Sequence, residues 1–147
     1  MTEKYISNSP LETFTIGFNL GPKIKKGNII TLRGELGSGK TQLISGICKF
    51  FKIDDIVTSP TFSIYNQYFG IIEKEEVVIF HIDLYRIKNL DELNEIGFEE
   101  VIQNDSLIKF IEWPDIAKNY LSKIDIEILI KIDNQDENKR EIIINFS

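Results

Sequence analysis

The stretch Gly34-Glu35-Leu36-Gly37-Ser38-Gly39-Lys40-Thr41 has the spacing G-x-x-x-x-G-K-[ST] of a phosphate-binding loop. Glycines at these positions let the backbone turn tightly, so that successive amide groups point inward at phosphate oxygens. In this pattern Lys40 reaches the β and γ phosphates of a nucleotide, and the hydroxyl of Thr41 is available to Mg²⁺. The loop therefore predicts nucleotide binding.

The segments on both sides of the loop fit a unit of strand, loop and helix. Residues 28–33 form a short apolar run typical of a buried strand, and residues 42–51 carry apolar side chains at helical spacing. The helix adds the positive end of its dipole to the phosphate site. This context favours a phosphate loop over a glycine turn that only caps a helix.

The rest of the chain also reads as helices and strands. Ser9-Pro10-Leu11-Glu12 fits a capping box that starts a helix, and Gly21-Pro22 should end it. Further strands are expected at 56–59, 62–69, 77–82 and 107–111, short helices at 91–95 (capped by Asp91) and 99–103, and a hairpin pairing 124–132 with 141–146. These elements predict a single α/β domain over residues 1–147, with a P-loop NTPase-like mixed β-sheet flanked by helices and a C-terminal antiparallel hairpin.

Composition and charge narrow the classes of protein. The 147 residues are 42% hydrophobic and 27% charged, which suits one globular core. The formal net charge of −6 argues against a protein that grips a nucleic-acid backbone by itself. A single cysteine and a single histidine exclude an intrachain disulfide and a Cys- or His-rich zinc site, so any metal should be a hard cation held by oxygen. With no apolar run near the roughly 18 residues of a membrane span, we expect a cytoplasmic protein.

Two carboxylates follow predicted buried strands. Asp83 comes directly after residues 77–82, and Glu112 directly after residues 107–111. In parallel α/β sheets, ligands gather at the carboxyl ends of the strands, so both side chains are expected near Thr41. Either one could hold magnesium or polarise an attacking water, and spacing alone does not choose between them.

Four other features have less specific patterns. His81 and Cys48 alternate with apolar neighbours and are interpreted as buried core residues. Trp113, between Glu112 and a proline, is either a core aromatic or a wall of the nucleotide pocket. Residue types alone favour an ordinary turn for Ser59-Pro60-Thr61 over a switch that senses the γ-phosphate.

Five segments occur in a specific order along the chain: GELGSGKT at 34–41, SPTF at 59–62, HIDLYR at 81–86, EIG at 95–97 and IEWP at 111–114. This set resembles the bacterial TsaE (YjeE) family, the ATPase of tRNA threonylcarbamoyladenosine biosynthesis. The resemblance covers nearly the whole chain, and only the phosphate loop is generic.

The resemblance implies ATP hydrolysis with Mg²⁺ in support of the TsaD and TsaB proteins, which modify adenosine 37 of tRNAs that read ANN codons. The tRNA would then be contacted only through that complex, and DNA not at all. By this resemblance, Asp83 corresponds to an essential aspartate of the family, and Arg140 corresponds to an arginine near the nucleotide. Residues 59–61 correspond to a switch-like loop. The resemblance implies that the ATP-binding loop consists of Leu36, Gly37, Ser38, Gly39, Lys40 and Thr41. It implies that the metal ligands are Thr41 and Glu112. The expected catalytic residues are Lys40, Asp83 and Glu112.

Three other functions fit a phosphate loop less well. A small-molecule kinase usually needs an arginine-rich lid, and this chain has only Arg33, Arg86 and Arg140. A GTPase-like switch would carry an Asn-Lys-x-Asp segment that reads guanine, and the chain has none. A purely structural role is disfavoured because Lys40 and Thr41 are intact, together with both carboxylates.

Overall fold

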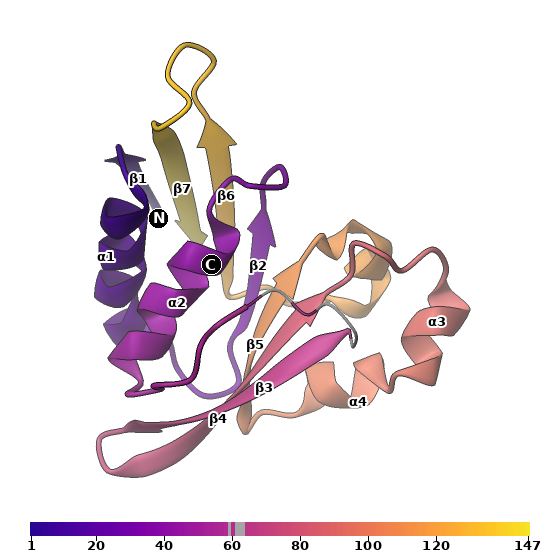
Figure 1. Cartoon of the computed structure of the whole chain (residues 1–147). Helices are drawn as coiled ribbons and strands as arrows, with labels where there is room; N and C mark the ends of the chain where they lie inside the picture. Colours follow the sequence, from indigo (N-terminus) through magenta and orange to yellow (C-terminus); the bar gives the residue numbers. More distant parts are fainter. Residues whose placement is uncertain (59, 61–63) are drawn as a thin grey trace.

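The glycine-rich loop connects strand β2 (Ile29–Arg33) to helix α2 (Lys40–Phe50), as its flanking pattern predicts. The computed structural model describes residues 1–58, 60 and 64–147. Within these residues the strands form one seven-stranded sheet in the order β1-β7-β6-β2-β5-β4-β3 (Figure 1). The remaining strands are β1 (Thr2–Ser7), β3 (Tyr65–Ile72), β4 (Glu75–Asp83), β5 (Leu107–Glu112), β6 (Ile126–Ile132) and β7 (Arg140–Phe146). The remaining helices are α1 (Pro10–Leu20), α3 (Leu90–Glu95) and α4 (Phe98–Gln103), with 3₁₀ segments at Gly21–Lys23 and Pro114–Tyr120.

The sheet is parallel in its centre and antiparallel at both sides. β2 pairs in parallel with β5 and β6, and β4 pairs in parallel with β5. The hairpins β3–β4 and β6–β7, and the pair β1–β7, are antiparallel. The expected mixed α/β sheet and C-terminal hairpin are confirmed, and the central parallel strands bring their carboxyl ends to the same edge.

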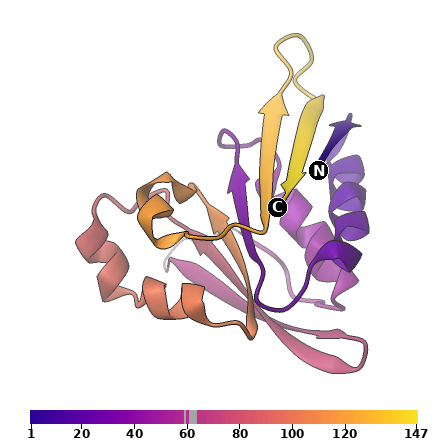
Figure 2. The same cartoon turned by 180° about the vertical axis from the view of Figure 1, so that it is seen from behind.

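Two hydrophobic cores cover the two faces of the sheet. Helices α1 and α2 pack on one face, while α3, α4 and the segment Pro114–Tyr120 pack on the other (Figures 1 and 2). Central strands contribute to both cores, since Ile30 belongs to the first and Ile29 to the second. This explains their continuous apolar runs, which are typical of strands buried on both faces. Cys48 lies in the first core, where burial raises the pKa of its thiol to about 12, as expected for a core residue.

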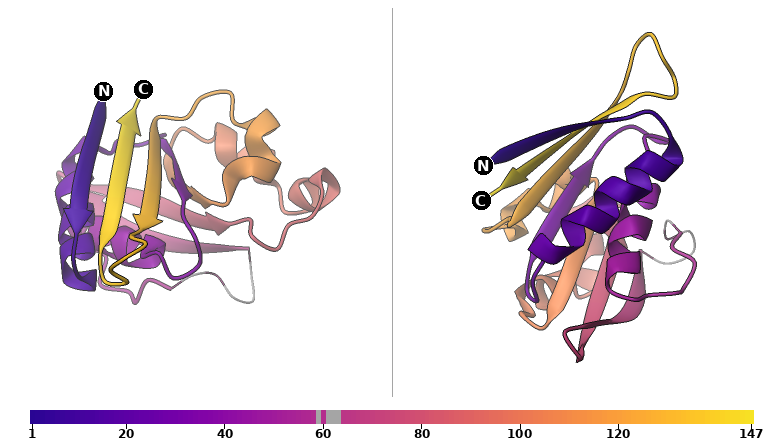
Figure 3. Two further views of the ribbon diagram at one scale, coloured as in Figure 1. Left: turned by 90° about the horizontal axis from the view of Figure 1, so that it is seen from above. Right: turned by 90° about the vertical axis from the view of Figure 1, so that its left-hand side faces the viewer.

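The hairpin β6–β7 extends past the sheet and ends above the phosphate loop (Figure 3). Buried isoleucines in its strands alternate with exposed or half-buried residues that are mostly polar, as the period-two pattern predicted. β7 also pairs with β1, a strand that the sequence pattern did not indicate. β1 is an edge strand with mostly exposed side chains, so it carries no apolar alternation to detect.

Some predicted boundaries are wrong. Residues 56–58 form no strand, and residue 59 lies outside the described part of the chain. β3 begins at Tyr65, and Ile64 is not part of it. Residues 62 and 63, where the predicted strand starts, lie outside the described part of the chain. The cap of α3 is Asn89, whose side chain accepts a hydrogen bond from the Glu92 amide, rather than Asp91, which lies in the first turn.

The predicted start of α1 is confirmed in a modified form. The Ser9 hydroxyl accepts a hydrogen bond from the Glu12 amide, and Pro10 occupies the first helical position. The Glu12 carboxylate reaches back to the amide of Asn8 rather than to that of Ser9. Among the helices of the described residues, none is both long and apolar enough to cross a membrane.

Two glycines let α1 and α2 touch backbone to backbone. A Cβ added at Gly17 would lie 2.2 Å from the Leu43 carbonyl oxygen, and one at Gly46 would lie 1.9 Å from the Phe14 carbonyl oxygen. Both distances are far below van der Waals contact, so neither position accepts a side chain unless the helices separate. α2 begins at the phosphate loop, so this contact also holds the loop in place.

Replacing Gly46 with alanine is expected to lower the free energy of unfolding by about 2–3 kcal/mol, because the helices must separate to admit the methyl group. The loss should occur although alanine favours an isolated helix by about 1 kcal/mol over glycine. Urea unfolding measures it, with Ser45→Ala on the same helix as a control that should change stability by less than about 0.5 kcal/mol. Equal effects of the two substitutions would contradict the packing argument.

Candidate functional site

The phosphate loop owes its conformation to glycines at two positions. Gly37 and Gly39 have φ angles of +78° and +109°, in the region that side chains disfavour, and Gly39 is the residue from which α2 starts. The Ser38 amide closes a tight turn onto the Glu35 carbonyl oxygen over 3.0 Å. The G-x-x-x-x-G-K-T spacing thus reflects backbone geometry, because a tight turn with two positive-φ glycines leads directly into the first turn of α2.

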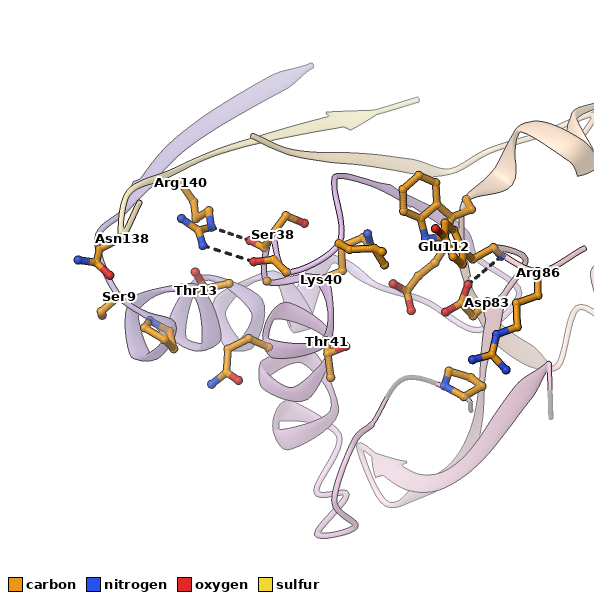
Figure 4. A pocket seen from close by; sticks show the side chains of 18 of the residues that line it. Ser9, Thr13, Ser38, Lys40, Thr41, Asp83, Arg86, Glu112, Asn138 and Arg140 are labelled. Carbon is orange, nitrogen blue, oxygen red and sulfur yellow. Dashed lines mark hydrogen bonds between the residues drawn. The ribbon is translucent and has the colours of Figure 1, made fainter. Parts of the chain in front are cut away.

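A cavity of about 720 Å³ opens over this loop (Figure 4). Its size suits a nucleotide-sized ligand. The predicted site residues all line it: Leu36, Gly37, Ser38, Gly39, Lys40, Thr41, Asp83, Glu112 and Arg140. The structure therefore brings together groups from three strands and one loop, although their individual roles stay predictions.

Several other residues line this cavity that the sequence analysis did not predict as binding or catalytic residues. Ser9, Pro10 and Thr13 come from the start of α1, and Asn138 from the β6–β7 turn. Their residue types are common. The packing of α1 against α2 brings the first three to the loop, and the β6–β7 hairpin brings Asn138 there. Arg86, Tyr85 and Pro60 line the cavity as well. Of the candidate switch segment, Pro60 alone is described, and Ser59, Thr61 and Phe62 lie outside the described residues.

Asp83 and Glu112 lie side by side at the carboxyl ends of β4 and β5, where they are register partners. Glu112 is almost fully buried, at 2% exposure. Burial raises the pKa of Asp83, and the charge of Glu112 raises it further, while a hydrogen bond from the Tyr85 amide works in the opposite direction. Two adjacent carboxylates with so little water favour a bound cation.

Lys40 faces this acidic pair from the phosphate loop. Its ammonium donates to the carbonyl oxygens of Gly34 (2.5 Å) and Glu35 (3.3 Å) and lies 4.5 Å from the centre of the Trp113 ring. Burial lowers the pKa of Lys40, and the charges of Glu112 and Asp83 oppose that shift. Trp113 is therefore a wall of the cavity, and its φ of +56° places a strained residue directly after Glu112.

Arg140 reaches the phosphate loop from the first residue of β7. Its guanidinium donates to the backbone oxygens of Ser38 (3.0 Å) and Gly37 (3.4 Å), as well as to two carbonyls of its own turn (Figure 4). The arginine lines the cavity as expected, but its hydrogen bonds go to the loop backbone. These two hydrogen bonds tie the start of β7 to the backbone of the phosphate loop.

His81 is buried on β4, as predicted for a core residue, but it is not an ordinary one. Its Nε2 lies 2.5 Å from Oε2 of Glu112, and its Nδ1 has no hydrogen-bond partner within the described part of the chain. His81 and Asp83 are two residues apart and so share one face of the strand. The spacing His-x-Asp at the end of a strand was the sequence signal that could have indicated this role. Periodicity alone predicts only that His81 is a buried core residue.

The donor set fits one kind of metal. Within residues 1–58, 60 and 64–147, no three His, Cys, Asp or Glu side chains are grouped so as to hold a metal ion. Mg²⁺ usually binds through one or two carboxylates, water and substrate phosphates rather than through a full protein cage. The Thr41 hydroxyl and the carboxylates of Glu112 and Asp83 supply such oxygens in one cavity.

A glycine-rich loop between a parallel strand and a helix, facing two carboxylates at adjacent strand ends, defines a nucleotide-binding protein of the P-loop NTPase fold. The profile of a family described as threonylcarbamoyl adenosine biosynthesis protein TsaE matches residues 7–142. The chain therefore belongs to the TsaE family, which takes part in the biosynthesis of threonylcarbamoyladenosine in tRNA.

Individual relatives agree with this assignment. The tRNA threonylcarbamoyladenosine biosynthesis protein TsaE of Rickettsia felis is 36% identical over 145 residues, covering 97% of this chain and 80% of the relative. TsaE of Bacillus subtilis is 32% identical over 139 residues, covering 95% and 82%. The crystal structure of YdiB from Bacillus subtilis superposes with a TM-score of 0.77 at 26% identity, covering 99% of this chain and 86% of the other.

Asp83→Asn is expected to raise the free energy of unfolding by about 0.5–1 kcal/mol at pH 7, because it removes a half-buried charge beside Glu112. The asparagine oxygen keeps the hydrogen bond from the Tyr85 amide. The folded-state pKa of Asp83 lies above its unfolded value, so the wild type gains stability as the pH falls through that raised pKa. The advantage of the variant should therefore shrink on acidification. Urea unfolding at a series of pH values checks this, and an advantage that grows at low pH would contradict it.

Arg140→Ala is expected to weaken nucleotide binding about tenfold, because two charge-assisted hydrogen bonds no longer hold the loop carbonyls. Lys139→Ala is the matched control: it removes a neighbouring positive charge on the same hairpin without touching the loop. Quenching of Trp113, the only tryptophan, during an ADP titration measures both affinities. Equal losses in the two variants would mean that Arg140 acts only through its charge.

Proposed function

We propose that this chain is a Mg²⁺-dependent ATP hydrolase that supports turnover of the TsaD–TsaB complex during threonylcarbamoyl modification of adenosine 37 in tRNA. The observation that carries this proposal is the meeting of Lys40, Thr41, Asp83 and Glu112 in one cavity over the phosphate loop. A loop without these groups would bind phosphate but would have nothing to hold a metal or orient water.

The phosphates would lie on the backbone amides of Leu36–Thr41, at the positive end of α2. Lys40 would then exchange its contacts with the Gly34 and Glu35 carbonyl oxygens for phosphate oxygens. The carboxylates lie at one end of the loop, whereas Arg140, Ser9 and Thr13 lie at the other (Figure 4). This polarity orients the terminal phosphate toward Asp83 and Glu112, and the nucleoside toward the start of α1.

Mg²⁺, when bound, neutralises charge that develops on the phosphoryl oxygens. Thr41 and Glu112 would hold it, because Glu112 is buried and fixed by its contact with His81. Asp83 is less buried, and its raised pKa suits a group that orients or polarises the attacking water. We therefore assign the metal to Glu112 and the water to Asp83.

The acidic net charge supports a division of labour in which the partner complex binds the tRNA and this chain supplies the nucleotide cycle. Phosphoryl transfer depends on positioning and charge neutralisation, so hydrolysis by the free chain should be slow and should rise when a partner completes the site. Hydrolysis would drive a conformational step that resets TsaD after each modification.

The test is phosphate release from ATP and from GTP, with and without Mg²⁺, by the chain alone and with purified TsaB and TsaD. ATP hydrolysis should depend on Mg²⁺ and rise with the partners, and Lys40→Ala should lower it by about 100-fold. Lys49→Ala, which removes an exposed lysine of the same helix, should match the wild type.

Three outcomes would overturn the proposal. Phosphate release by Lys40→Ala at the wild-type rate would place hydrolysis elsewhere. A preference for GTP would point to a different nucleotide cycle. ATP binding without stimulation, together with transfer of the phosphate to an added hydroxyl compound, would favour a kinase.

A further inference from the structure

The contact between His81 and Glu112 joins two neighbouring strands beneath the floor of the cavity. His81 is on β4, Glu112 ends β5, and their side chains are 0% and 3% exposed. The two atoms, Nε2 and Oε2, are 2.5 Å apart. A contact this short between water-excluded groups is typical of a charge-assisted hydrogen bond, which is stronger in a low-dielectric interior than in water.

The chemistry of the two groups sets the direction of this bond. When the Glu112 carboxylate is ionised it can only accept, and the imidazole then donates from Nε2–H. In the neutral ring Nδ1 is then a bare lone pair, which agrees with its lack of a partner among the described residues. Asn66, the register neighbour of His81 on β3, directs its amide to the Thr58 carbonyl and the Tyr68 hydroxyl instead. Among the described residues, Glu112 is therefore the hydrogen-bond partner of the His81 imidazole.

This arrangement does more than fill the core. An apolar side chain of similar size would pack at position 81 without leaving an unpaired nitrogen, since an orphaned buried polar atom costs free energy. Glu112, in contrast, has several rotatable bonds and a carboxylate with two equivalent oxygens. Without a fixed donor it could turn toward Lys40, whose charge interacts with it. A hydrogen bond from His81 fixes one oxygen of the Glu112 carboxylate, Oε2, and so restricts rotation of the side chain.

We propose that His81 is a positioning residue that locks Oε2 of Glu112 and thereby leaves Oε1 as the oxygen offered to the metal ion of the nucleotide. The inference rests on the proposed role of Glu112 as the metal ligand. It also explains the His-x-Asp spacing of β4, because residues two apart on a strand share one face. One strand thus supplies both the support for Glu112 and the second carboxylate, Asp83.

The test compares His81→Leu, which has no donor, with His81→Gln, whose amide places an N–H near the position of Nε2. ADP is titrated at a series of Mg²⁺ concentrations, with Trp113 fluorescence as the readout. His81→Leu should raise the Mg²⁺ concentration for half-maximal tightening of ADP binding by about 10–100-fold, as loss of an outer-sphere support does elsewhere. ADP affinity without Mg²⁺ should stay close to wild type. His81→Gln should recover most of the Mg²⁺ response.

Glu112→Gln separates failure of the inference from failure of the proposed function. If Glu112→Gln leaves the Mg²⁺ response unchanged, the metal role of Glu112 is wrong. If Glu112→Gln weakens the response and His81→Leu does not, the positioning role of His81 is wrong. A loss of ADP affinity that is equal with and without Mg²⁺ would mean that His81 is only structural. Should His81→Leu fail to fold, His81→Asn, whose shorter amide does not reach Glu112, replaces it and must show the same shift.

Discussion

The parallel pairing of β2, β5 and β4 is the constraint on which the site depends. Parallel strands end at the same edge of a sheet, so this pairing places the phosphate loop after β2 beside Glu112 and Asp83. The edge then holds one buried ammonium and two carboxylates in a small volume with little water. Such a cluster is poorly satisfied by the protein alone, and a nucleotide with its cation is the kind of ligand that balances it.

Several groups at the same edge of the sheet are energetically unfavourable in the folded protein. Asp83 is a partly buried carboxylate with a raised pKa, and Trp113 has a left-handed backbone conformation. One ring nitrogen of His81 has no hydrogen-bond partner among the residues that the structure describes. Strain and desolvation of this kind persist where the surrounding structure determines them, and they cluster at functional sites. Here the surrounding structure is the pair of hydrophobic cores on the two faces of the sheet and the glycine contact between α1 and α2.

Two contacts show how remote segments shape the phosphate loop. Arg140 starts β7 and bonds to backbone oxygens about a hundred positions earlier in the chain. The start of α1 closes the cavity on the same side, because α1 lies against α2. Segments from the first and last thirds of the sequence therefore help to shape the nucleotide site, although the local sequence motif lies within residues 34–41 alone.

Much of the molecule was predictable from local patterns. The spacing of glycines, lysine and threonine predicts the loop, continuous apolar runs predict the central strands, and alternating isoleucines predict the last hairpin. These signals are readable because backbone geometry and burial act on residues close together in the chain. The edge strand β1, the donor at His81 and the loop contacts of Arg140 were not predictable in this way. Each arises from strand register or helix packing between distant segments, and only the folded sheet brings those segments together.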